Sequence, residues 1–122
     1  MAERNLSRLL EKLAVYRHPG VWAYREGRGN EDAVFTFRER DGDSHIAPAG
    51  PDAALDNRWV WLELTVYSDL NAVGFLAAVA TALAAEGVPC NAIAALHHDH
   101  IFVPDSLAAR AIEAIEALAG TQ

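Results

Sequence analysis

The run His97-His98-Asp99-His100 places four potential metal ligands in consecutive positions. In an extended segment successive side chains point to opposite faces, so His98 and His100 lie on one face and His97 and Asp99 on the other. Zinc sites need three or four protein ligands, and neither face presents three. The run therefore predicts a polar turn in which Asp99 accepts hydrogen bonds from nearby backbone N–H groups, and we expect no metal site. If a tight turn brings the four side chains together, they could bind a metal ion. A metal-dependent enzyme is therefore a further alternative.

The turn from Ser68 to Gly74 precedes a predicted helix and is the first candidate for a ligand site. The N-terminus of a helix presents unpaired N–H groups and a partial positive charge, so it can hold a carboxylate or a phosphate. Gly74 has no side chain and lets a ligand or a neighbouring backbone approach closely. The structural alternative is that Ser68 and Asp69 cap the helix and Gly74 lets it pack on a strand.

Known catalytic arrangements are missing from the sequence. Cys90 lies in an apolar context with no basic neighbour, which indicates packing and not a nucleophile. The chain has no G-x-S-x-G, no phosphate-binding loop and no dinucleotide fingerprint. Trp22, Trp59 and Trp61 could stack on bases, but the scarcity of basic residues favours a role in packing. We expect no enzyme and no cofactor.

The elements that would position these residues follow from the hydrophobic pattern. Residues 59–67 alternate, which predicts a strand whose core-facing residues are Val60, Leu62, Leu64 and Val66. A helix is expected over residues 71–86, ended by Gly87, with the buried stripe Val73, Leu76, Ala77, Ala80, Leu83 and Ala84. Residues 90–96 should form a short buried strand, residues 101–103 the next strand, and a helix begins at Pro104 with Ala108, Ala111, Ile112, Ile115 and Leu118 buried.

The first half of the chain predicts a helix followed by short strands. Residues 4–14 have the leucine spacing of a helix with one buried face. Residues 21–25 and 33–40 are expected to pair as a hairpin, and residues 45–47 to form a short edge strand. We place the boundary at Asn57, with residues 1–57 as an N-terminal half and residues 58–122 as the C-terminal half. The order strand–helix–strand–strand–helix in the second half matches the split βαβ arrangement, an α+β ferredoxin-like fold.

Length and charge exclude several classes of protein. The 122 residues suffice for one compact domain or two small halves sharing a core. Seventeen acidic against ten basic residues give a net charge of −7, which argues against binding to nucleic acid or to anionic membranes. No segment is apolar enough for a signal peptide or a membrane span. With a single cysteine, which fits a reducing compartment, we expect a cytoplasmic protein.

The motifs of the second half resemble those of a known family. The stretch from Trp59 to Gly74 and the segment from His97 to Pro104 resemble the small bacterial ACT-domain proteins of the DUF2241 group. His18-Pro19-Gly20, residues 36–39 and residues 46–48 resemble that group's N-terminal half. The second half is also similar to the arginine-binding ACT repeats of the CASTOR nutrient sensors. The resemblance implies an α+β ferredoxin-like fold of two ACT-like halves, an antiparallel sheet covered by helices.

The resemblance also implies a function, the regulatory binding of a small molecule, usually an amino acid, where the first strand turns into the first helix. In the sensors the aspartate that corresponds to Asp99 contacts the cationic end of arginine, whereas their acidic residue near position 72 is Ala72 here. A homodimer or higher oligomer is expected. The alternative is a protein-interaction module that keeps the ACT fold without a metabolite. The candidate ligand-binding residues are Ser68, Asp69, Leu70, Ala72, Val73, Gly74, Phe75, Asn91, His98 and Asp99.

Overall fold

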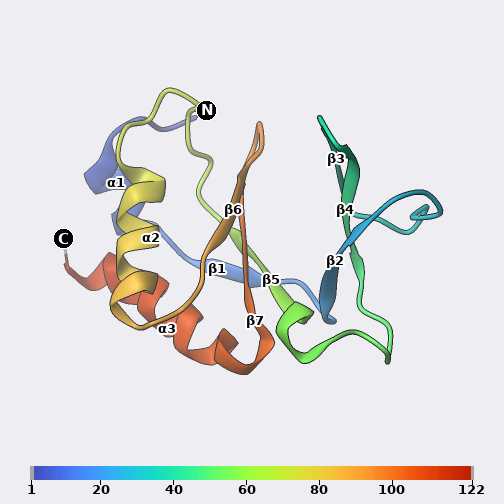
Figure 1. The fold of residues 1–122 in the computed structure, drawn as a ribbon. Helices are drawn as coiled ribbons and strands as arrows, with labels where there is room; N and C mark the ends of the chain where they lie inside the picture. Colours follow the sequence, from blue (N-terminus) through green and yellow to red (C-terminus); the bar gives the residue numbers. More distant parts are fainter. Residues whose placement is uncertain (1, 122) are drawn as a thin grey trace.

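The structure, a computed structural model, describes residues 2–121 as a curled antiparallel sheet with its helices gathered on one side (Figure 1). The strands are β1 (Val15–Arg17), β2 (Trp22–Glu26), β3 (Phe35–Glu39), β4 (Gly42–Pro48), β5 (Trp59–Leu64), β6 (Asn91–Ala94) and β7 (Asp99–Pro104). The helices are α1 (Leu6–Glu11), α2 (Phe75–Ala85) and α3 (Ala108–Ala117), with short 3₁₀ turns at Leu55–Asn57, Asp105–Leu107 and Leu118–Thr121. The fold is therefore mixed α+β, as the pattern predicted.

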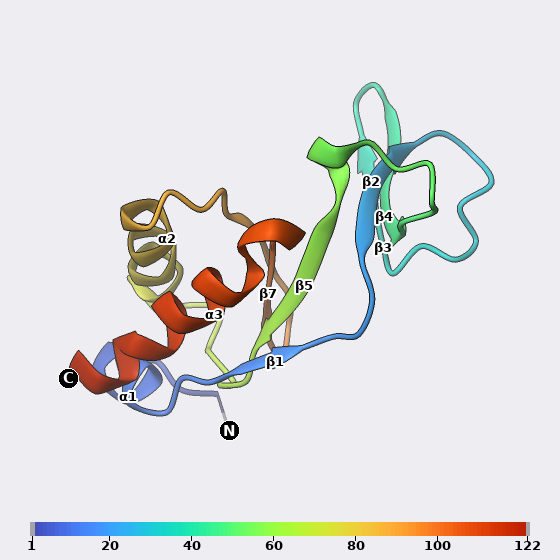
Figure 2. The ribbon, with the colours of Figure 1, turned by 90° about the horizontal axis from the view of Figure 1, so that it is seen from below.

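Strand β5 is the centre of the sheet, whose order is β3-β4-β2-β5-β7-β6 with β1 also paired to β5. Val60, Leu62 and Leu64 are fully buried, as predicted, but the strand ends at Leu64 and Val66 is only partly buried. They face α2 and α3, and the three leucines of the first segment, Leu9, Leu10 and Leu13, enter the same core. The helices lie on one side of β5 and β7, while β2, β3 and β4 stand on the other (Figure 2).

Strands β1 and β2 lie one after the other along the same edge of β5. Val15 to Arg17 pair with Leu64 to Leu62, and Trp22 pairs with Trp59. Strand β1 was not predicted, because three residues are too few to show a period. His18, Pro19 and Gly20 separate β1 from β2, and the first helix, predicted over residues 4–14, ends at Glu11.

The predicted hairpin between the second and third strands is wrong. Strand β4 lies between β2 and β3 and pairs with both, so it is the middle strand of this part and not a short edge strand. The hydrophobic pattern missed its length because Gly42, Asp43 and Ser44, which begin the strand, are residues that favour turns. His45, in its centre, is polar but buried. The ring of His45 bonds to Thr36 Oγ1 at 2.9 Å and to the Gly27 carbonyl at 2.7 Å. Hydrogen bonds of this kind remove most of the cost of burying a polar side chain.

Aromatic side chains fill the space between β2–β4 and the β5–β7 strands. The Phe102 ring stacks on Trp61 with ring centres 5.9 Å apart and meets Phe35 and Tyr24 edge-on. Phe102 is fully buried although it faces away from the helices. The sheet therefore has packed side chains on both faces, aliphatic below the helices and aromatic on the other side.

Helix α2 begins later than predicted, at Phe75, and its buried stripe is Phe75, Val79 and Leu83. Of the predicted stripe, Leu83 is buried and Leu76 half-buried, whereas Ala77, Ala80 and Ala84 are exposed. Val73 precedes the helix and is 84% exposed. The prediction for the end of the helix is confirmed. Gly87 has a φ of 69°, and Val88 N–H donates to the Leu83 carbonyl in a Schellman-type closure.

Strand β6 was expected to be buried, but it is the exposed outer strand beyond β7. Two of its four residues are alanine, and Ile93 is the one that is half-buried. Within residues 2–121 no helix combines the length and the apolar character of a membrane span. The division of the chain into halves at Asn57 stays a prediction.

Candidate functional site

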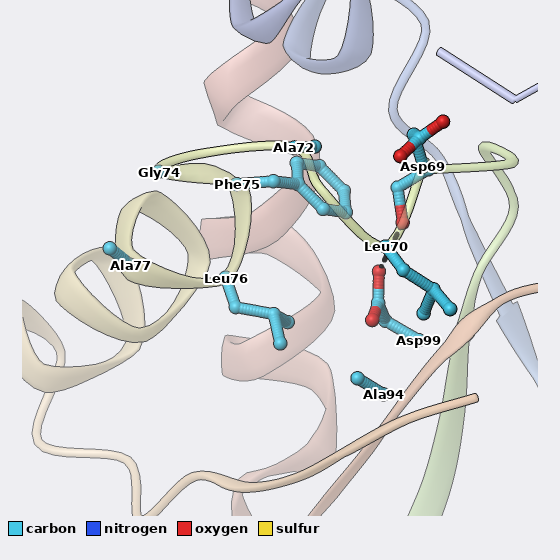
Figure 3. Close-up of a pocket in the computed structure, with 10 residues that line it drawn as sticks. Asp69, Leu70, Ala72, Gly74, Phe75, Leu76, Ala77, Ala94 and Asp99 are labelled. Atoms are coloured by element: carbon cyan, nitrogen blue, oxygen red, sulfur yellow. Dashed lines mark hydrogen bonds between the residues drawn. The ribbon is translucent and has the colours of Figure 1, made fainter. Parts of the chain in front are cut away.

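A pocket of about 170 Å³ lies where the turn after β5 meets the start of α2 and the hairpin of β6 and β7 (Figure 3). Ligand pockets for drug-sized molecules span about 300–1,000 Å³, so this one suits a smaller ligand. Its lining residues are Ser68, Asp69, Leu70, Ala72, Gly74, Phe75, Leu76, Ala77, Ala94 and Asp99. It is where the sequence placed the candidate site.

The start of α2 supplies the positive side of this pocket. No side chain caps the helix, and the N-cap position is Gly74. The first N–H groups of a helix have no acceptor within it, and the helix dipole adds a partial positive charge. The N–H groups of Phe75, Leu76 and Ala77 are in this first turn. The pocket therefore has donors at one end that an anionic group of a ligand can use.

The backbone conformation at position 74 favours glycine. Its φ of 91° lies in the left-handed region, which costs a residue with a side chain about 1–3 kcal/mol. The Leu6 side chain packs over this position, with Cδ2 3.4 Å from where a Cβ would lie. Gly74 thus turns the chain sharply into α2 beside the Leu6 side chain of α1. Because glycine has no side chain, the first N–H groups of α2 are left uncapped.

The negative side of the pocket is the carboxylate of Asp99, at the first residue of β7. The residue is only 4% exposed. The Ser68 hydroxyl donates a hydrogen bond of 2.7 Å to Asp99 Oδ2 and fixes its orientation. The second carboxylate oxygen points toward the pocket (Figure 3). Among the described residues, no basic side chain forms an ion pair with Asp99, so this buried charge is available to a cationic group.

Asp69 borders the pocket, but its carboxylate points away from it (Figure 3). Its Oδ1 accepts a 2.7 Å hydrogen bond from the Asn71 N–H, and its Oδ2 lies 3.3 Å from Arg4 Nε. The Asn71 hydrogen bond is the main reason why the pKa of Asp69 lies below its usual range, and Arg4 lowers it further. Asp69 therefore shapes the turn and does not compete with an anion at the start of α2.

The structure brings seven of the ten predicted residues together in the pocket: Ser68, Asp69, Leu70, Ala72, Gly74, Phe75 and Asp99. Three lie outside its lining. Val73 points into solvent, Asn91 is at the far end of β6, opposite Phe102, and His98 reaches toward Glu63. Leu76, Ala77 and Ala94 line the pocket and were not predicted. A helix predicted to start after Gly74 would have placed Leu76 and Ala77 in its first turn, beside the pocket. Ala94 lines the pocket because it pairs with Asp99 across β6 and β7.

The histidine run divides as its alternation predicts. Asp99 faces the pocket, whereas His98 and His100 lie toward Glu63 and Trp61 on the other face. Cys90 is half-buried, and burial raises the pKa of its thiol, which disfavours the reactive thiolate.

Comparison with known proteins agrees with this architecture. Residues 58–117, from the start of β5 through α3, match the model of a family described as the ACT domain. A Vibrio cholerae protein, VC0802, described as of unknown function and a possible transport protein, is 31% identical with a TM-score of 0.75, and the match covers 89% of this chain and 92% of that one. Atu0741 of Agobacterium tumefaciens has the same fold at 14% identity, with a TM-score of 0.69 over 88% and 89% of the two chains. No curated protein matches the chain.

A sheet with helices on one side is the arrangement of the ferredoxin-like fold. The chain contains an ACT domain, formed by residues 58–117. ACT domains are regulatory, non-catalytic modules that bind small molecules.

Proposed function

We propose that this protein binds a free amino acid in the pocket between the start of α2 and Asp99. The α-carboxylate of the ligand accepts hydrogen bonds from the N–H groups of the first turn of α2, and its α-ammonium pairs with Asp99. The observation that carries the proposal is the pairing of an uncapped helix start with a buried carboxylate that forms no ion pair with a basic side chain among the described residues.

The charges of this pocket match those of a zwitterion. A buried carboxylate without a cation is costly, and a ligand ammonium removes that cost with charge-assisted hydrogen bonds. Hydrogen bonds to charged groups contribute about 1.5–3 kcal/mol each, so both ends of the ligand add to affinity. A ligand that lacks either charge should bind much more weakly.

The rest of the lining indicates the side chain of the ligand. Leu70, Phe75 and Leu76 surround the space with apolar groups, and Asp99 is the carboxylate that points into it (Figure 3). If Asp99 binds the α-ammonium, no acidic group is left for a guanidinium, since position 72 is alanine. We therefore expect a small neutral amino acid and not arginine. The narrower relation to the DUF2241 group and to the arginine sensors stays a prediction.

A second candidate function is self-association or binding of another protein through the free side of β6. This strand is exposed, and Leu70, Val73 and Leu96 near the pocket are 65%, 84% and 61% exposed. An unpaired strand edge beside apolar side chains is a surface on which a second chain can add. Such a module would keep the ACT fold without a metabolite.

A thermal-shift panel of the twenty amino acids tests the proposal. A ligand that binds only the folded protein at a hundred times its dissociation constant adds about 2.7 kcal/mol of stability, a shift of several degrees for a domain of this size. We expect a shift with one or a few neutral amino acids. The matching hydroxy acid, which lacks the ammonium, and the matching amine, which lacks the carboxylate, should give none.

No shift with any amino acid at millimolar concentration would contradict the proposal. Sedimentation of the same samples would then test the second candidate function. An oligomer of the ligand-free protein at micromolar concentration would favour self-association.

A further inference from the structure

A second polar cluster lies on the opposite face of the sheet from the pocket. Glu63 of β5 and His100 of β7 are cross-strand neighbours, and His18 reaches them from the break between β1 and β2. His18 Nε2 is 2.9 Å from Glu63 Oε1. One ligand atom from each of these three side chains lies within 4.8 Å of the other two. The chain thus brings two imidazoles and a carboxylate together from three separate segments.

A fourth side chain borders this cluster. His98 is two residues before His100 and on the same face of the hairpin, and its Nδ1 is 3.7 Å from Glu63 Oε2. The side chains of His18 and Glu63 are 21% and 24% exposed, so an ion can enter from solvent. The sequence run alone could not indicate this cluster, because Glu63 and His18 are far from it along the chain.

Trp61 holds the cluster in its present arrangement. Its indole N–H donates a 3.0 Å hydrogen bond to His100 Nδ1, and its ring lies flat against His18, with ring centres 3.5 Å apart and an angle of 7°. A neutral imidazole that accepts at Nδ1 carries its proton on Nε2. A metal ion that binds His100 at Nδ1 therefore displaces the hydrogen bond from Trp61, and one that binds at Nε2 displaces the ring proton.

We propose that His18, Glu63 and His100 form a binding site for a divalent transition metal ion of the Zn²⁺ type. Two histidines and one glutamate with a position left for solvent or a further ligand are a known zinc ligand set. Imidazole nitrogen favours zinc, copper or nickel over Mg²⁺ and Ca²⁺, which prefer oxygen. His98 is placed to supply the fourth ligand.

The geometry needs little change to accept the ion. Zinc holds nitrogen and oxygen ligands at about 2.0–2.2 Å, which sets tetrahedral neighbours roughly 3.5 Å apart. To reach that spacing from within 4.8 Å, the partly exposed side chains of His18 and Glu63 would have to rotate. The ion would join the segment before β2 to the β5–β7 strands, so it would stabilise the contact between the two parts of the sheet.

Titration calorimetry of the tag-free, metal-free protein with ZnCl₂ tests the site. The wild type should bind one ion per chain. His18→Gln and Glu63→Gln should each weaken binding by more than about 100-fold, because loss of groups that only support a ligand already costs about 10–100-fold. The matched control is His97→Gln, which removes an exposed histidine of the same run outside the cluster and should bind as the wild type does.

Trp61→Phe distinguishes a metal site from a merely structural ion pair. Removing the indole N–H frees Nδ1 of His100, so this variant should bind Zn²⁺ more tightly than the wild type. Circular dichroism confirms that each variant is folded. Equal binding by wild type, His18→Gln and His97→Gln, or no binding by the folded wild type at 100 µM Zn²⁺, would overturn the proposal. The amino-acid panel is independent of this result, since the two sites are on opposite faces of the sheet.

Discussion

Replacement of Phe102 by alanine is expected to lower the free energy of unfolding by about 3–5 kcal/mol, the usual cost for a buried phenylalanine. Phe102 is fully buried and packs against Trp61, Phe35 and Tyr24. Its loss leaves a cavity between β2–β4 and the β5–β7 strands, which meet through one residue pair of β2 and β5. Domains of this size have about 5–15 kcal/mol of stability in all, so the variant should be close to unfolding.

Urea unfolding followed by circular dichroism measures this loss. Leu55→Ala is the control, since Leu55 is 92% exposed and its truncation should change stability by no more than about 0.5 kcal/mol. A loss below about 1 kcal/mol in Phe102→Ala would show that the aromatic face is not a packed core in solution.

Asp99→Asn is expected to weaken binding of the amino acid found in the panel by about 10- to 150-fold. The substitution keeps the shape of the side chain and removes its charge, and hydrogen bonds to charged groups contribute about 1.5–3 kcal/mol. The Ser68 hydroxyl can still donate to the amide oxygen, so the fold should persist. Titration calorimetry with wild type and variant gives the ratio of dissociation constants.

Asp69→Asn is the matched control for this experiment. It changes the same residue type on the same turn, but the carboxylate of Asp69 points away from the pocket and toward Arg4. It should bind within about threefold of the wild type. If both variants lose affinity equally, net charge and not Asp99 determines binding, and the proposed role of Asp99 is wrong.

The sequence predicts the second half of the fold well where residues alternate strictly. Val60, Leu62 and Leu64 are buried as expected, and the glycine at position 87 marks the end of α2. Asp99 and the turn before α2 meet in one pocket, although they are separated by about thirty residues of chain. The resemblance to ACT domains indicated that meeting, since hydrophobic periodicity alone does not show which turns come together.

The errors have physical causes that a pattern of apolar residues does not contain. Ser68 and Asp69 are good capping residues, but the left-handed turn at Gly74 starts the helix, so Val73 precedes it and is exposed. Gly42 and Asp43 hid the length of β4, because these residue types favour turns although here they pair with β3. The cluster of His18, Glu63 and His100 depends on the pairing of β5 with both β1 and β7, which is tertiary information.

The central claim is that the start of α2 and Asp99 bind the two charged ends of one amino acid. The most direct measurement is a ¹H–¹⁵N correlation spectrum of the protein titrated with the amino acid found in the panel. The account predicts that the amides of Phe75, Leu76 and Ala77 shift most, together with those of Ser68 and Asp99, while the amides around His18 stay in place. Shifts confined to β6 or to the aromatic face, with the amides of the α2 start unchanged, would contradict it.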